Sequence, residues 1–199
     1  MALDFPLNPT NGQAYENYYY DSSITAWRSA GSKTGVNQRV TTLESQVIPI
    51  TSGTINYANM PAGSVLQVIY AQTSTQVNLS SSTYTDTTLT ASITPRKSNS
   101  KILVTINQQA YKGSGNAGNA YNGILLRGST VLFQFAKDYL GTGTTIEIKG
   151  LASNTYLDSP NTTSSTTYKT QFANAVAANQ VISQLSNGIS TITLMEIAT

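Results

Sequence analysis

Short strand-like segments separated by turn signals fill the sequence from residue 54 to residue 199. Apolar residues recur at every second position, as Leu89, Ala91 and Ile93 do between polar neighbours, which is the period of a strand with one buried face. Comparable segments lie at 65–70, 101–108, 121–127, 130–135, 145–151, 168–172 and 189–197. At least eight strands at short spacing, without helical crossovers, predict an all-β fold: an antiparallel, jelly-roll-type β-sandwich.

The composition supports this fold class and argues against most enzymes. The chain has no cysteine and no histidine, so Ser-His-Asp triads and the usual zinc and haem ligands are missing, and we expect no enzyme activity, cofactor or metal. Eleven basic against nine acidic residues leave a net charge of +2, and the basic residues are scattered. Nucleic acid is therefore an unfavourable partner. No run approaches the ~18 apolar residues of a membrane span, and no secretory signal opens the sequence.

Residues 1–34 differ from the rest because aromatic side chains gather in a short, turn-rich segment. The Asn11-Gly12 pair is a turn signal. Such a segment is too short for a large core, so it is either a self-packed β-hairpin unit or an arm that buries its aromatics in a partner. The candidate docking residues are Phe5, Tyr15, Tyr19, Tyr20 and Trp27.

Residues 35–53 carry a helical period. Val36, Val40, Leu43 and Val47 are spaced four, three and four residues apart, with polar residues between them, and Pro49 ends the pattern. Three helical turns are marginal alone in water, so this helix packs either on its own domain or on two copies of itself in a short trimeric coiled coil. In the second case these four residues form the trimer interface.

Two candidate ligand sites remain within the sandwich. Paired carboxylates can hydrolyse glycosides without histidine. The candidates Asp86, Asp138, Glu147, Asp158 and Glu196 fall in separate strands or turns, however, and Glu147 and Glu196 fit outward-facing strand positions. A loop between two strands, Lys112 to Asn122, is rich in glycine and asparagine. Within or beside this loop, the side chains of the kinds that bind carbohydrate are Tyr111, Asn116, Asn119, Tyr121 and Asn122. The tyrosines can equally be ordinary strand ends.

Several motifs resemble virion structural and tail-fibre proteins of tailed bacteriophages, especially those of marine cyanobacteria. The opening FPLNPTNGQAY, the later YYD and AWR, the body segments GSVLQV, TYTDT and SNSKILV, and the end STITLMEI carry this resemblance over most of the chain. These motifs are structural and locate no catalytic or binding residue.

The resemblance implies an N-terminal virion-attachment segment at 1–34, a trimerising helix and linker at 35–53, and a C-terminal β-sandwich at 54–199 that faces the host. The expected protein is a homotrimeric tail or head fibre on the virion. Its N-terminus would dock on another virion protein, such as a tail adaptor, baseplate or capsid protein, and the Lys112–Asn122 loop would contact host surface glycan. The alternatives are a capsid decoration or cement protein and a lectin without a virion role.

Overall fold

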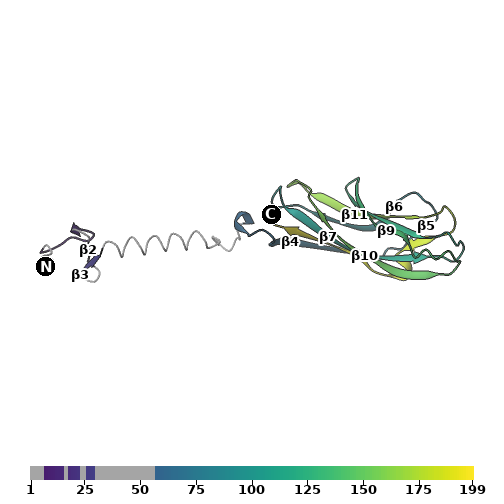
Figure 1. Cartoon of the computed structure of the whole chain (residues 1–199), viewed down its shortest axis with the longest axis horizontal. Helices are drawn as coiled ribbons and strands as arrows, with labels where there is room; N and C mark the ends of the chain where they lie inside the picture. The colour runs from purple at the N-terminus through teal and green to yellow at the C-terminus, as the bar shows by residue number, and fades with distance from the viewer. Residues whose placement is uncertain (1–6, 16–17, 23–25, 30–56) are drawn as a thin grey trace. The chain divides into compact units, whose positions relative to one another are not determined.

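The computed structural model describes residues 7–15, 18–22, 26–29 and 57–199, which fall into two compact units, one within residues 1–56 and one spanning residues 57–199 (Figure 1). The trimer-interface candidates Val36, Val40, Leu43 and Val47 lie outside the described residues, as does Phe5. The expected helical neck lies there too. Neither of the two short 3-10 turns in the described ranges is a candidate membrane-spanning helix.

The N-terminal unit contains a small antiparallel sheet of β1 (Ala14–Tyr15), β2 (Tyr18–Asp21) and β3 (Ala26–Ser29). The Asn11-Gly12 turn precedes it: Gly12 has a φ of 80° and donates its N–H to the Tyr20 carbonyl at 2.9 Å. In the β2–β3 register Tyr20 lies opposite Trp27. Strands of two to four residues enclose little apolar volume, so we do not expect this sheet to be stable by itself.

The C-terminal unit begins with the 3-10 turn η1 (Tyr57–Asn59) and is an antiparallel β-sandwich, which confirms the predicted fold class. Its first sheet contains β4 (Val65–Thr73), β5 (Val77–Leu79), β7 (Lys101–Lys112), β10 (Ile148–Asp158), β12 (Val181–Ser183) and β13 (Ser190–Ile197). Its second sheet is ordered β6 (Thr85–Ile93), β11 (Thr166–Asn174), β8 (Tyr121–Arg127) and β9 (Thr130–Tyr139).

Strand β7 organises the first sheet. One edge of β7 pairs with β10 along eleven consecutive positions, from Lys112 opposite Ile148 to Ile102 opposite Asp158. The other edge is shared: β13 pairs with residues 101–107 and β12 with residues 110–112. The chain therefore leaves the sheet between β12 and β13, through Gln184 with a φ of 55° and the 3-10 turn η2 (Leu185–Asn187).

The hydrophobic core lies between the two sheets and follows the alternation of the sequence. Every second residue of β6 from Thr87 and of β7 from Ile102 is buried, as the period of two requires. The buried apolar residues of the central strands include Leu89, Ile93, Ile102, Val104, Ile106, Leu125, Phe172, Ile192 and Leu194. Tyr121 stacks on Phe172 inside this core, with ring centroids 5.3 Å apart.

A buried polar network crosses the core where β12 and β13 separate. The Thr170 hydroxyl donates to Gln108 Oε1 at 3.0 Å and also bonds the Thr87 hydroxyl, so β6, β11 and β7 are joined. The Gln184 amide is oriented to accept from Gln108 Nε2 at 2.6 Å and from Ser190 Oγ at 2.8 Å.

The same network satisfies backbone groups that the strand break would leave unpaired. Ser190 Oγ accepts the Gln109 N–H at 2.9 Å, and the Gln184 amide donates to the carbonyls of Thr75 and Thr87. Buried backbone groups without partners are costly, so these side chains stabilise the gap in the strand pairing.

The predicted strands lie where the sequence places them, but some begin or end at other residues than expected. The Gly128-Ser129 pair forms a two-residue hairpin between the predicted strands at 121–127 and 130–135, with Arg127 opposite Thr130 and a φ of 58° at Gly128. The strand predicted at 145–151 instead occupies Ile148–Asp158, because it pairs along nearly the whole length of β7. The short strands β5 and β12 were not predicted, since three residues give too little periodicity.

Replacing Thr170 with valine should destabilise the sandwich by about 1–3 kcal/mol, because Gln108 Oε1 and the Thr87 hydroxyl lose a buried partner while the side-chain volume stays similar. The control Thr167→Val lies on the same strand at an exposed position and should change stability by less than about 0.5 kcal/mol. Urea unfolding followed by circular dichroism measures both. Equal effects of the two substitutions would contradict a stabilising role for the network.

Candidate functional site

The sandwich has two different ends. At the base, where the chain enters from residue 57, the Gly63 N–H donates to the Ala198 carbonyl at 2.8 Å, so the start of β4 and the C-terminus lie together (Figure 1). Connections 94–100, 128–129 and 159–165 belong to the same end. At the opposite end, the tip, four connections gather: 80–84, 113–120, 140–147 and 175–180.

Buried asparagines hold two of the tip loops together. Asn174 Nδ2 donates to Asn119 Oδ1 at 3.0 Å and to the Ala178 carbonyl at 3.1 Å, and Asn174 Oδ1 accepts the Ala120 N–H at 3.2 Å. Asn119 Nδ2 in turn donates to the Gly113 carbonyl. The loop 113–120 is therefore fixed against the loop 175–180.

A buried lysine holds a third tip loop. Lys112, the last residue of β7, is fully buried, and its Nζ donates to the carbonyls of Thr144 at 2.7 Å and Ile146 at 3.1 Å. The loop 140–147 is thus anchored to β7 through its backbone. The tip is preorganised by hydrogen bonds that leave its outer side chains free for other contacts.

The structure brings only part of the predicted glycan-binding set to the surface. Tyr121 is fully buried in the core, with its hydroxyl 2.7 Å from Ser183 Oγ, and Asn119 is fully buried in the asparagine cluster. The expectation that these two side chains face outward is therefore wrong. Tyr111 is 6% exposed and contributes almost no surface.

Asn116 and Asn122 are the members of that set that remain partly exposed. Asn116 Oδ1 accepts the Gly118 N–H at 2.7 Å, and Asn122 Oδ1 accepts the Asp138 N–H at 2.8 Å. Both amides thus support local backbone while lying at or near the tip. The misplaced expectation arose because Tyr and Asn serve equally well as surface ligands and as buried hydrogen-bonding residues.

The carboxylates do not form a catalytic pair. Glu196 is fully buried at the base, where its oxygens accept the Arg96 N–H at 2.7 Å and the Gln67 side chain at 2.6 Å, so the outward orientation predicted for it is wrong. Glu147 lies exposed, as expected, but in a loop rather than a strand. Asp138 is also exposed.

Asp158 connects the two sheets. Its carboxylate accepts two hydrogen bonds from Arg127 Nη1, at 3.0 and 2.8 Å, and one from the Tyr168 hydroxyl at 2.7 Å. Burial and the neighbouring Asp158 carboxylate raise the pKa of Tyr168 well above its ordinary value, which keeps this hydroxyl a donor. Asp158 therefore stabilises the fold. Among the described residues, no three carboxylates cluster as a metal site would require.

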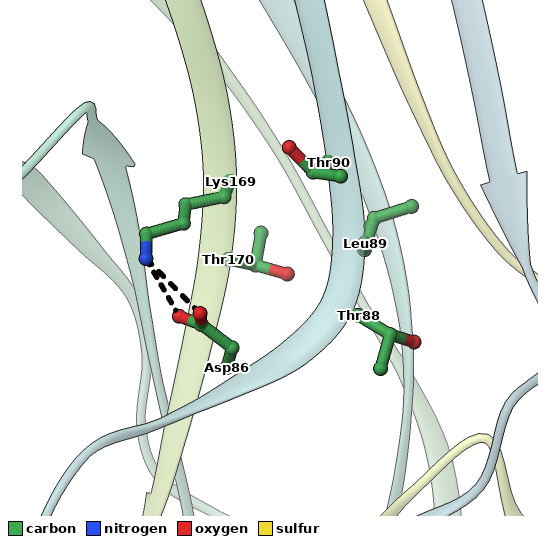
Figure 2. Close-up of a pocket in the computed structure, with 6 residues that line it drawn as sticks. All are labelled: Asp86, Thr88, Leu89, Thr90, Lys169 and Thr170. Carbon is green, nitrogen blue, oxygen red and sulfur yellow. Dashed lines mark hydrogen bonds and ion pairs between the residues drawn. The ribbon is translucent and has the colours of Figure 1, made fainter.

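A shallow pocket of about 140 Å³ opens on the outer face of the second sheet, over β6 and β11 (Figure 2). Asp86 and Lys169 face each other across it, with both carboxylate oxygens 3.0 Å from Nζ. Gln171 Nε2 donates to Asp86 Oδ1 at 2.8 Å. The remaining walls come from Thr88, Leu89, Thr90 and Thr170.

A β-bulge produces this pocket. Lys169 pairs with Thr90 and Gln171 with Asp86, so three residues of β6 lie opposite one residue of β11. The bulge places Thr88 at a φ of 70°, which is strained for a β-branched residue. The Thr88 hydroxyl bonds that of Thr73 on β4 at 2.8 Å, an interaction that ties the edges of the two sheets together.

The pocket chemistry is that of a small polar surface site. Burial alone raises the pKa of the Asp86 carboxyl, but the hydrogen bonds from Gln171 and Lys169, together with the Lys169 charge, outweigh burial and hold that pKa below its ordinary value. The site thus presents an ionised carboxylate and an ammonium group that already satisfy each other. The sequence does not reveal this site, because a bulge leaves no periodic signal.

Of the docking candidates, Tyr15, Tyr19, Tyr20 and Trp27 all lie in the three-stranded N-terminal sheet. Only for Tyr20 is the exposure of the side chain described, and it is half-buried.

Neither a protein-family model nor a curated protein matches the chain. Among solved structures, the VP2 subviral particle of infectious bursal disease virus is similar with a TM-score of 0.41 and 11% identity, over 77% of this chain and 42% of VP2. The Gx strain of the same virus gives 0.41 and 11%, over 76% of this chain and 36% of that one.

The T=1 particles derived from the same virus give a TM-score of 0.40 and 11% identity, over 77% of this chain and 40% of that chain. The chain thus spans about two-fifths of the length of the capsid proteins that it resembles. Both the scores and the identities are low, and they assign neither a family nor an activity.

The pKa of Asp86 should rise toward about 3.9 when Gln171 is replaced by leucine, because the carboxylate loses a hydrogen bond that favours its charged form. In the native protein the folded pKa lies below the unfolded one, so the small stabilisation by Asp86 is present above about pH 4 and disappears as the pH falls through the folded pKa. Carboxyl-carbon NMR titration measures the shift. An Asp86 midpoint already at or above about 3.9 in the unmodified protein would contradict the assigned interactions.

Proposed function

We propose that this protein is a virion structural protein, most specifically a homotrimeric phage tail or head fibre. In this proposal the N-terminal segment docks on another virion protein, the heptad-patterned segment trimerises, and the sandwich faces the host. The proposal rests on the resemblance of the sequence motifs to tailed-phage virion proteins and on the polarity of the sandwich.

The polarity of the sandwich is the observation that carries this proposal. The chain enters the sandwich at the base, and the tip presents four loops at the opposite end, three of them fixed by Asn174, Asn119 and Lys112. A fibre head needs this arrangement, because the end remote from the attachment point must meet the host while keeping a defined shape. Preorganised loops lose little conformational freedom on binding.

The N-terminal sheet supports the docking role. Its strands are two to four residues long, and its tyrosine-rich sequence brings more aromatic groups than such a sheet can enclose. We therefore assign the aromatic residues Tyr15, Tyr19, Tyr20 and Trp27 to the contact with the partner virion protein, together with Phe5. The partner is a tail adaptor, baseplate or capsid protein.

For host contact we propose weak, repeated binding of surface glycan by the outer side chains of the tip. Three copies on one trimer raise the avidity even when each site binds only at the millimolar level, about −4 kcal/mol. Asn116 stays within this proposal, whereas the buried Asn119 holds the loop and Tyr121 belongs to the core.

Particle assembly and host adsorption test the proposal together. Deletion of residues 1–34 should yield a folded, β-rich protein that no longer incorporates into particles, because the docking aromatics are lost. In full-length protein, Ser114→Arg places a bulky cation on the exposed tip and should reduce adsorption several-fold without lowering the melting temperature. Immunolabelling of purified particles and adsorption assays provide the two readouts.

The matched control is Ser98→Arg, an exposed serine at the base, which should leave adsorption unchanged. Normal incorporation of the truncated protein would contradict the docking role of the N-terminus. Normal adsorption of particles carrying Ser114→Arg would remove the tip from the host contact and favour a capsid decoration protein. Glycan binding by a protein that never incorporates into particles would favour a free lectin.

A further inference from the structure

The outer face of the first sheet carries an apolar row that crosses four strands. The pairing registers place Leu157 of β10 opposite Leu103 of β7, Leu103 opposite Met195 of β13, and Met195 opposite Val68 of β4. We call these four residues the base row. Val68 and Leu157 are 54% and 49% exposed, so the row is open to solvent at both ends.

The neighbouring rows are uncharged and rich in threonine. The next row toward the tip holds Thr155, Thr105, Thr193 and Tyr70, and the row after it holds Ser153, Asn107, Thr191 and Gln72. Lys101 and Lys149 are the charged side chains at the outward positions of these strands, and they lie at the two opposite ends of the face. The outer face of the second sheet differs, because it carries the Asp86–Lys169 ion pair.

The width of the face fits a threefold arrangement. Four strands spaced about 4.8 Å apart form a face about 19 Å wide, and three such faces enclose a triangular prism whose axis lies about 5.5 Å from each sheet. Sheets that pack face to face lie about 10 Å apart, which leaves about 5 Å for the side chains of each sheet. Side chains of ordinary length on three copies can therefore fill the prism.

From these observations we propose that the outer face of the first sheet packs around a threefold axis against the same face of two further copies of this chain. This inference rests on the trimer of the proposed function and names the surface through which the sandwiches meet. The base row forms the apolar centre of the contact, and the threonine rows continue it toward the tip.

The position of the base row favours a second copy of this chain as its occupant. The row lies at the base, where the chain arrives from residue 57, and Tyr57 lies ten positions after Val47, the last position of the heptad pattern. Ten positions span at most about 36 Å, so a trimeric coiled coil at 36–47, if formed as proposed, would keep three sandwich bases within that distance of its end. The base row and the two rows next to it carry no charged side chain, so these rows meet their own copies without charge repulsion.

The small area of the face implies that this contact depends on the proposed coiled coil at 36–47, which would hold the three copies together. Three rows of four residues cover about 400 Å² on each copy, estimated from strand and residue spacing. Stable interfaces between separate proteins bury about 800 Å² per partner, so the isolated faces associate only weakly. The seam at 36–47 would supply an effective concentration in the millimolar range, at which weak apolar contacts form.

Two matched valines test the proposal in the full-length protein. Val68 and Val131 are 54% and 55% exposed and lie on the outer faces of the first and second sheets respectively. Val68→Lys should weaken the trimer at least tenfold, because three ammonium groups enter the contact, whereas Val131→Lys should leave the association unchanged. Sedimentation equilibrium over a range of concentrations measures both.

Cross-linking gives a second readout that does not require a destabilising change. The chain has no cysteine, so Met195→Cys introduces one thiol near the proposed axis, and a short thiol-specific cross-linker should give covalent dimers within each trimer. Val131→Cys should not cross-link at the same protein concentration. The inference is supported if Met195→Cys cross-links, Val131→Cys does not, and Val68→Lys weakens the trimer.

The outcomes separate this inference from the proposed function. A wild-type trimer that neither Val68→Lys weakens nor Met195→Cys cross-links overturns the sheet-face contact and leaves the trimeric fibre intact. A wild-type chain that sediments as a monomer overturns the trimer itself, and the face contact falls with it. Cross-linking of the Val131 variant instead would place the second sheet at the axis and overturn the inference.

Discussion

The fold depends on one constraint: a single long strand, β7, must pair along both edges although no other single strand covers its second edge. Strands β12 and β13 share that edge and leave a gap opposite residues 108 and 109. Buried N–H and C=O groups in such a gap would lack hydrogen-bond partners, which would lower the stability of the fold. Ser190 Oγ accepts the Gln109 N–H, and Gln108 Nε2 donates to the Gln109 carbonyl. Gln184 donates to the carbonyls of Thr75 and Thr87, and Thr170 extends the network to the other sheet.

The two ends of the sandwich, the base and the tip, are held by different interactions. At the base, the buried Glu196 accepts backbone N–H groups of the connection 94–100, and the first and last strands start and end together. At the tip, Asn174 and Lys112 fix loops through hydrogen bonds to backbone carbonyls. Between the two ends the sheets expose different surfaces: the first has uncharged rows that are apolar near the base, and the second has an ion pair above a bulge. In the proposed fibre, the tip, the base and the uncharged rows would serve separate contacts.

Periodicity predicted the sandwich well, because inward-facing positions alternate strictly in β6 and β7. It failed where burial depends on tertiary context. Glu196 occupies an inward position of β13, which an alternation of threonine and leucine does not reveal, and Tyr121 and Asn119 are buried although their residue types suit a ligand site. The pocket at Thr88 depends on a bulge whose register follows from strand pairing alone. The base row was equally invisible, because its four residues come from four strands far apart in the sequence.

The proposed trimer would join the heptad spacing of residues 36–47, the uncharged rows of the first sheet and the outward tip in one assembly. Native mass spectrometry of the full-length protein at low micromolar concentration tests this claim directly. The account predicts a single species with three times the mass of the 21.2-kDa chain. A monomer under these conditions, or a species with any other number of copies, would contradict it.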